Sequence, residues 1–387
     1  MLDDNGDFDV LGLIAVALLD DYDGRRQPVP QHNSVLTGAL YYEEIMATVN
    51  DNRYLQVARM DKETFMLLKG LLMNAGGLLD SLYLCAGQKL MILIYVMRGH
   101  TNRETAERWQ HSGSTISEVV HEVSACLTSI KHLIYKPANE GDPIASQIAN
   151  FAKFSPFFDD CIGALDGTHI PAVVKADQIA RFSNRKKFTS QNVLGVANFD
   201  LTFAYALYGW EGSAHDSRVV DDAKVKGLPL IPEKYYLGDG GYGLKKHILT
   251  PYRGERINVI EFNLNGQGPV NKRELFNRRH ASLRNAVERI FGVVKRRFPI
   301  LTKMSPYAFE FQCDIVQCCF LFHNFIRLNE LYEDAFYDDD GNAPDDVVDD
   351  ENDDADEDGP EMNALKAWRN GIADAMWAHY QLQLANL

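Results

Sequence analysis

The fold is decided by residues 161–170, C-I-G-A-L-D-G-T-H-I, in which a short apolar run leads into the acid Asp166. A buried strand that ends in Asp-Gly presents a carboxylate at the edge of a sheet. The same design returns in L-G-D-G-G-Y, around Asp239, and a basic helix further along carries Glu288. These three acids are the candidate catalytic residues and metal ligands.

Three carboxylates suit hard divalent cations. Proteins bind Mg²⁺ through one or two carboxylates, with substrate phosphates and waters completing the coordination. Two such ions about 3.5 to 4 Å apart stabilise the attacking and leaving oxygens of an in-line phosphoryl displacement, without a protein nucleophile. The pattern therefore predicts two ions per site and chemistry on DNA strands.

The charge is unevenly distributed along the 387 residues, which carry a net charge of −15. Residues 333–361 hold 16 Asp or Glu and no Lys or Arg, which leaves 38 acids against 39 bases elsewhere. The acidity thus belongs to one segment and does not exclude a nucleic-acid partner. The 46% hydrophobic content indicates a soluble globular protein with a substantial core.

The six cysteines form no C-x-x-C pair, which favours free thiols in a reducing compartment over disulfides or zinc. The apolar residues 10–19 are too few to span a bilayer and lack the basic flank of a signal peptide. We therefore expect neither secretion nor membrane insertion.

The order of patterns predicts an α/β protein whose mixed sheet, flanked by helices, is preceded by an all-α region. Strand-like runs occur at 162–165, 170–174, 193–199 and 203–208. The expected parts are a flexible arm (1–40), a helical region (41–135), a catalytic domain (142–332), a disordered acidic linker (333–361) and a C-terminal helix (362–387).

Residues 88–130 predict three helices, with T-x-x-E capping boxes at Thr101 and Thr115 and a short glycine break before the last helix. This matches a helix-turn-helix. An ordinary helical hairpin is the alternative, because the third helix lacks the Arg or Lys at its start that would contact phosphates or guanine. The candidate DNA contacts there are Ser114, Thr115 and Ser117.

A basic run lies between the first two acids and contains Arg185, Lys186 and Lys187. It is either a solvated loop or, as we favour, a contact to a nucleic-acid backbone. In the later segment G-S-A-H-D-S-R, His215 and Asp216 are candidates to support the metal site, but we favour a helix start here, with Asp216 or Ser213 as the cap.

The basic helix at residues 277–298 places one set of side chains on a single face, because they recur at steps of three or four. These are Asn277, His280, Arg284, Glu288 and Phe291. Glu288 among arginines could be a surface ion pair, but an apolar face beside it favours docking on the sheet. We expect His280 to position its neighbours rather than bind metal, and Arg284, Lys295 and Arg297 to contact DNA.

These motifs resemble the PIF/Harbinger-type DDE transposases and their domesticated nuclease relatives. The resemblance rests on L-D-G-T-H-I, L-G-D-G-G-Y and N-x-x-H-x-x-x-R-x-x-x-E-x-x-F-G-x-x-K-x-R-F, and covers about residues 41–331. It implies an RNase H-like catalytic domain behind a helix-turn-helix, Mg²⁺ or Mn²⁺, and DNA cleavage with strand transfer by Asp166, Asp239 and Glu288.

The resemblance also implies partners. Members of this family commonly need a Myb-like protein for end binding and import into the nucleus, where we expect this chain to act. Joining two DNA ends makes a homodimer plausible by analogy. The alternative is a domesticated DNA-binding or scaffold protein that keeps the fold without using its chemistry.

Overall fold

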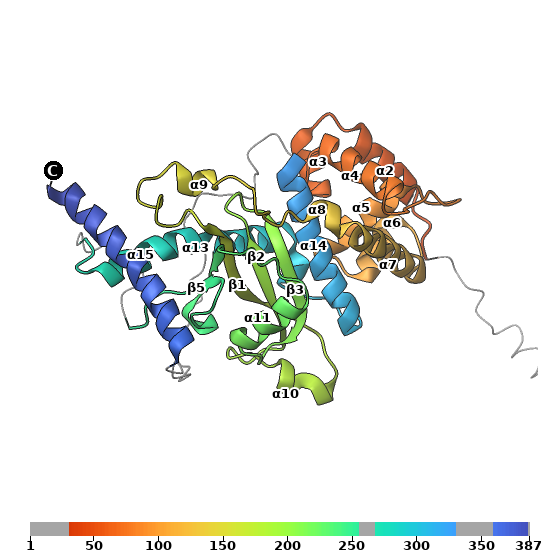
Figure 1. Cartoon of the computed structure of the whole chain (residues 1–387). Coiled ribbons are helices and arrows are strands. Elements are labelled where there is room, and N and C mark those ends of the chain that lie inside the picture. Colours follow the sequence, from red (N-terminus) through yellow and green to blue (C-terminus); the bar gives the residue numbers. More distant parts are fainter. Residues whose placement is uncertain (1–30, 255–267, 330–358, 386–387) are drawn as a thin grey trace, which may run out of the picture.

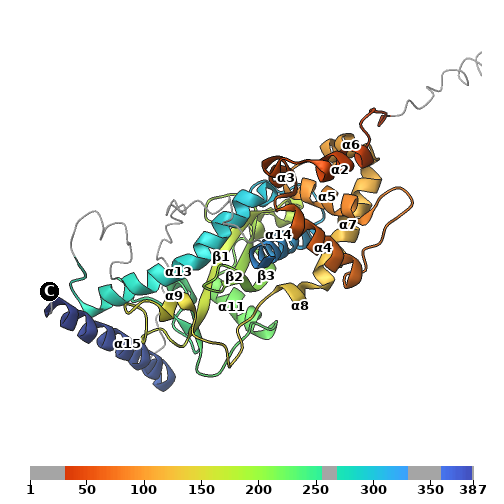
Figure 2. The same cartoon turned by 90° about the horizontal axis from the view of Figure 1, so that it is seen from above.

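The structure, a computed structural model, describes residues 31–254, 268–329 and 359–385 (Figure 1). Most of the expected arm and nearly all of the expected acidic linker lie outside these residues. A sheet stands at the centre, a helical region lies at one end, and helix α15 (Pro360–Ala385) lies at the other (Figures 1 and 2). None of the helices in the described ranges has the length and apolar character needed to cross a membrane.

The helical region contains short helices, most of which are capped at the first turn by the preceding side chain. They are α2 Gly38–Ala47, α3 Asp51–Ala58, α4 Lys62–Asn74, α5 Ala86–Met97, α6 Asn102–Trp109, α7 Gly113–Ser129 and α8 Lys131–Ile134. The capping box between Thr101 and Glu104 is confirmed. The second predicted box is wrong, because α7 begins at Gly113 and the Ser112 hydroxyl accepts the Thr115 N–H.

The sheet has five strands in the order β3-β2-β1-β4-β5. They are β1 Cys161–Pro171, β2 Ser190–Ala197, β3 Phe203–Glu211, β4 Tyr235–Leu237 and β5 Ile248–Leu249. β1, β2 and β3 pair antiparallel, whereas β4 runs parallel to β1 and β5 parallel to β4. This confirms the predicted mixed sheet.

β1 corrects one prediction. The runs at 162–165 and 170–174 are not separate strands, because β1 continues through Asp166 and Gly167 and pairs with β2 from Ala164 to Pro171. Asp166 lies opposite Gly195, within the strand rather than at its exit. Gly167 does not form a turn. It allows the Asn192 side chain to lie close to the β1 backbone, since a Cβ at position 167 would stand 3.1 Å from the Asn192 side-chain oxygen.

The remaining helices surround the sheet. They are α9 Ser146–Ala149, α10 Ile179–Phe182, α11 Asp216–Val225, α13 Lys272–Arg297, α14 Phe309–Asn329 and the short 3-10 helices η1 Ala176–Gln178, η2 Gly240–Tyr242 and η3 Pro299–Leu301. Within α14, Asn324 bonds both backbone groups of Phe203, and His323 bonds the Leu201 carbonyl. Both side chains are buried, and these contacts tie α14 to the β2–β3 turn and the start of β3.

The two faces of the sheet have separate apolar clusters. Ala164 and Ile170 of β1 pack with residues of α13 and α14, in a core that extends without a break into the helical region. Leu165 of β1 packs with Leu194 and Val196 of β2 and with residues of α11. Because side chains alternate along a strand, Asp166 shares the face of Ala164 and points toward α13. In Figure 2, α13 runs from the α15 end of the molecule toward the helical region.

Candidate functional site

The register of the parallel strands brings the first two acids together. Ala164 of β1 is paired with Leu237 of β4, the last residue of that short strand. Asp166 and Asp239 each follow two positions later, Asp166 within β1 and Asp239 just after β4 at the start of η2. Both therefore lie at the same end of neighbouring strands, which are about 4.8 Å apart. Each carboxylate also accepts a hydrogen bond from the next backbone N–H, at 2.8 Å for Asp166 and 2.7 Å for Asp239.

Helix α13 is fixed against the same end of the sheet by two buried polar side chains. Asn277 donates to the Tyr252 carbonyl at 2.9 Å and accepts the Tyr252 N–H at 2.8 Å. His280 bonds the Leu249 carbonyl, at the end of β5, at 2.9 Å. Burial lowers the pKa of His280 to about 3, so the ring is neutral. The expected positioning role of His280 is consistent with these contacts.

Arg284 connects the third acid to the first. One amino group of its guanidinium lies 2.6 Å from Asp166 Oδ2, and the other pairs with Glu288 one helical turn further on. Its side chain is 14% exposed. The expected DNA contact of Arg284 is thus replaced by a contact inside the acid cluster. Glu288 belongs to this cluster, because the same arginine joins it to Asp166.

The cluster carries more negative than positive charge. Burial raises the pKa of the Asp166 carboxyl group to about 7, and the Arg284 guanidinium opposes that rise. Repulsion from three further carboxylates adds to it, those of Asp239, Glu288 and Asp216. Four carboxylates therefore face one guanidinium, and the site is suited to additional positive charge.

The donor chemistry fits a hard divalent cation, since carboxylate oxygens are the ligands that Mg²⁺ and Mn²⁺ prefer. The positions of the described side chains do not by themselves form a metal site. Among the described residues, no three His, Cys, Asp or Glu side chains are grouped closely enough to hold a metal ion between them. Arg284 joins Asp166 to Glu288 by pairing with both carboxylates.

Asp216 is placed differently from the favoured prediction. It is the first residue of α11, and the helix has no side-chain capping bond at its start. The Asp216 carboxylate instead accepts a 3.1 Å hydrogen bond from Asn192 of β2. The capping interpretation is therefore wrong, and Asp216 lies beside the acid cluster. His215 occupies the N-cap position and is exposed.

The basic loop lies near the same cluster. Arg185, Lys186 and Lys187 are exposed in the turn between α10 and β2, where Ser183 and Thr189 form an isolated bridge. The charge of Arg185 lowers the pKa of the Asp216 carboxyl group, against the stronger upward effect of burial. The loop therefore presents bases to solvent beside the acids.

The two basic residues near the end of α13 have different surroundings. Lys295 donates to the Thr168 hydroxyl at 2.7 Å, two residues beyond Asp166 on β1. Arg297 is fully buried, so the prediction that it contacts DNA is wrong. It lies at the junction with the helical region, where its charge helps to lower the pKa of Arg59 below its ordinary value.

The predicted recognition helix exposes few side chains that could bind DNA. Ser114 is exposed and Thr115 and Ser117 are partly exposed in the first turns of α7. The outward face continues with Glu118 and Glu122, and Glu122 pairs with the buried Lys89 at 2.8 Å. The face thus offers hydroxyl groups and acids, and the helix-turn-helix stays a prediction.

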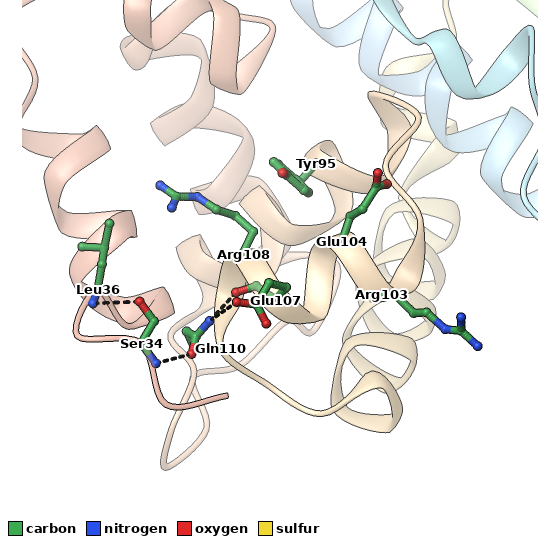
Figure 3. A pocket seen from close by; sticks show the side chains of 8 residues that line it. All are labelled: Ser34, Leu36, Tyr95, Arg103, Glu104, Glu107, Arg108 and Gln110. Carbon is green, nitrogen blue, oxygen red and sulfur yellow. Dashed lines mark hydrogen bonds between the residues drawn. The ribbon is translucent and has the colours of Figure 1, made fainter. Parts of the chain in front are cut away.

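A pocket of about 540 Å³ lies in the helical region (Figure 3). Its lining residues are Ser34, Leu36, Tyr95, Arg103, Glu104, Glu107, Arg108 and Gln110. Gln110 accepts the Ser34 N–H at 2.8 Å, which ties the segment before α2 to the end of α6. None of the three candidate acids lines this pocket, so it is separate from the acid cluster.

Two residues of the cluster were not expected from the sequence. Asn192 orients Asp216, and Tyr242 places its hydroxyl group among the carboxylates. Asn192 carries no local signal, because its partner lies 24 positions away. Tyr242 could have been noticed, since it follows Asp239 by three residues in the G-D-G-G-Y motif.

The sheet, the two neighbouring aspartates and the glutamate on α13 lie in a region that matches a known family. Residues 165–324 match the family model described as the DDE superfamily endonuclease, a range that includes all three acids. This part of the chain is therefore similar to the DDE superfamily endonucleases, as the resemblance of its motifs predicts. Residues 33–129 match a domain of unknown function, DUF8040.

One curated relative is Protein ALP1-like from Arabidopsis thaliana, which is 28% identical over 237 residues. The match covers 55% of this chain and 53% of the relative, so the chain spans about half the length of the relative that it matches. No solved structure matches the chain.

Proposed function

We propose that this chain is a metal-dependent DNA endonuclease and transposase with an RNase H-like catalytic domain. The observation that carries the proposal is the placement of Asp166 on β1 beside Asp239, which lies just after β4, with Glu288 of α13 joined to Asp166 through Arg284. One strand, the segment just after its parallel neighbour and one helix thereby contribute the three acids of one cluster, which is the arrangement that the resemblance implies.

Asp166, Asp239 and Glu288 would hold two Mg²⁺ or Mn²⁺ ions, which supply Lewis-acid stabilisation of the attacking and leaving oxygens when bound. The chain contributes orientation, because a backbone N–H fixes one oxygen of each aspartate. Arg284 favours the ionised form of Asp166, the form that binds a cation. In the proposed reaction water, and then a 3′-hydroxyl group, attacks phosphorus and a strand P–O bond breaks.

The proposal includes a DNA path over the exposed bases beside the cluster, with Arg185, Lys186 and Lys187 as phosphate contacts. Lys295 would approach the same strand from α13. The α7 face offers hydroxyl groups and acids but no Arg or Lys. This supports a role for a Myb-like partner, which would bind the DNA ends and accompany the chain into the nucleus. A homodimer would bring two ends together.

The test is Asp166→Asn, which keeps the size of the side chain and an acceptor for Arg284 while removing the charge. We expect loss of Mg²⁺- or Mn²⁺-dependent cleavage with DNA affinity nearly unchanged. The matched control is Asp221→Asn, an exposed acid of α11 paired with Lys245. Cleavage by Asp166→Asn at the rate of the unmodified protein would overturn the proposal.

A second function is favoured by one observation. Arg284 already pairs with both Asp166 and Glu288, and no three potential ligands in the described part of the chain are grouped around a cation site. This suits a domesticated DNA-binding or scaffold protein of the same fold. The absence of any Mg²⁺- or Mn²⁺-dependent nicking of the terminal repeats, with a Myb-like partner present, would select this alternative.

A further inference from the structure

Asp216 reaches the acid cluster from the opposite face of the sheet. It begins α11, whose apolar side chains pack with Leu165 and Tyr242, whereas Asp166 faces α13. Asn192 of β2 donates to Asp216 Oδ1 at 3.1 Å and so fixes the direction of the carboxylate. This acid therefore comes from an element that contributes none of the other three.

Two glycines leave room for it. A Cβ on Gly167, directly after Asp166, would stand 3.3 Å from Asp216 Oδ1. A Cβ on Gly241, two residues after Asp239, would stand 3.7 Å from Asp216 Oδ2. The chain therefore brings the Asp216 carboxylate against the backbone that follows both aspartates of the triad.

The Tyr242 hydroxyl group is a second and independent observation. Tyr242 is 1% exposed, and its hydroxyl group has no hydrogen-bond partner among the described residues. The same Cβ on Gly167 would stand 3.3 Å from this hydroxyl oxygen, so it lies beside Asp216 at the cluster. A buried phenol group normally has a partner, and an unpartnered one directed at carboxylates indicates a ligand.

We propose that Asp216 is a fourth acid of the cation site, oriented by Asn192, and that the Tyr242 hydroxyl group donates a hydrogen bond to water or a phosphate oxygen within it. This inference rests on the proposed function, because it assigns further residues to the same site. The ligand is a hard divalent cation, and the site spans both faces of the sheet at Gly167.

The experiment measures Mn²⁺ binding to the full chain without DNA, by electron paramagnetic resonance of the free ion. Asp216→Asn should weaken binding by about 10-fold, the lower end of the effect of altering groups around a metal site. Asp221→Asn, on the same helix, removes the same charge and should bind Mn²⁺ as the unmodified protein does. Asp166→Asn reports on the proposed site itself.

Tyr242→Phe gives a second readout that does not depend on the fold of Asp216→Asn. Without Mn²⁺ the variant should unfold at the same or a higher temperature, because it removes a buried group that has no partner. With Mn²⁺ its gain in unfolding temperature should be smaller than that of the unmodified protein, since stabilisation follows the affinity for the ion.

The outcomes separate the two proposals. Weak Mn²⁺ binding by Asp166→Asn together with unchanged binding by Asp216→Asn, or equal Mn²⁺ stabilisation of Tyr242→Phe, would overturn the inference and leave the three-acid site standing. Failure of the unmodified protein to bind Mn²⁺ would overturn the cation site and the inference with it.

Discussion

Arg284 Nη1 lies 2.6 Å from Asp166 Oδ2, and this ion pair joins helix α13 to the middle of strand β1. Replacing Arg284 with Met would leave the Asp166 carboxylate buried beside other acids. We expect the free energy of unfolding to fall by about 3 kcal/mol in the presence of a chelator, because breaking a buried pair leaves an uncompensated charge. Urea denaturation measures it, and added Mg²⁺ should restore part of the stability.

Arg289→Met is the matched control, because Arg289 is exposed on the same helix. Its effect should stay within about 0.5 kcal/mol, as for surface substitutions away from special features. Equal stability of Arg284→Met and Arg289→Met in chelator would show that the Asp166 pair contributes nothing to the fold.

The grouping of the three acids in one cluster could be predicted, because each stands in a recognisable local motif. Asp166 and Asp239 both follow apolar runs and precede glycine, and Glu288 follows Arg284 at helical spacing. What the pattern could not show is that β1 continues past Asp166. That depends on hydrogen bonds from β2, whose residues lie more than 20 positions away.

Two side chains were misassigned for the same reason. A short acid before a helix favours capping, but Asp216 turns toward Asn192, a partner that the local sequence does not reveal. A basic run at the end of a helix indicates exposure, yet Arg297 is buried where α13 meets the helical region. Both roles depend on contacts between distant segments.

The buried ring of His323 should make the fold sensitive to acid. Burial and the nearby charge of Arg297 lower its pKa to about 3, against a hydrogen bond to the Leu201 carbonyl. An unfolded histidine binds its proton near pH 6.5, so between these values the unfolded state holds more protons and stability falls as the pH falls. From pH 7 to pH 5 this one ring should cost about 2 kcal/mol.

His323→Gln keeps a donor for Leu201 and removes the titrating group. Its free energy of unfolding should therefore fall less than that of the unmodified protein on the same acidification. His280, which has a similarly lowered pKa, is present in both proteins and cancels in the comparison. Parallel pH profiles of the two proteins would contradict the assignment.

The exposed lysines between α10 and β2 should contribute to DNA affinity by pairing with phosphates. Replacing Lys186 and Lys187 with Ala should weaken binding about equally for all sequences. The slope of log affinity against log salt should fall by about 0.9 for each phosphate that is no longer neutralised. Fluorescence anisotropy at several salt concentrations measures both effects.

A matched pair of exposed lysines lies on the helical side of the molecule, Lys131 and Lys136. Their replacement with Ala removes the same charge at a distance from the acids and should leave the salt slope unchanged. A salt slope equal in the two double variants would indicate that the loop beside the acids is only solvated.

The acidic segment should compete with DNA for the basic surface of the chain. Residues 333–361 contain 16 acids, enough to compete with DNA for exposed lysines and arginines. Deleting residues 337–358 leaves α15 whole, because that helix begins at Pro360. Non-specific DNA binding should become tighter, and most clearly at low salt, where charge interactions are least screened.

A neutral Gly/Ser segment of the same length is the control for this deletion, since it removes the charge and keeps the connection to α15. The neutral replacement should tighten DNA binding as much as the deletion does, because charge and not length is responsible. If neither protein binds DNA more tightly than the unmodified chain at any salt concentration, the segment does not compete with DNA and serves only as the connection between α14 and α15.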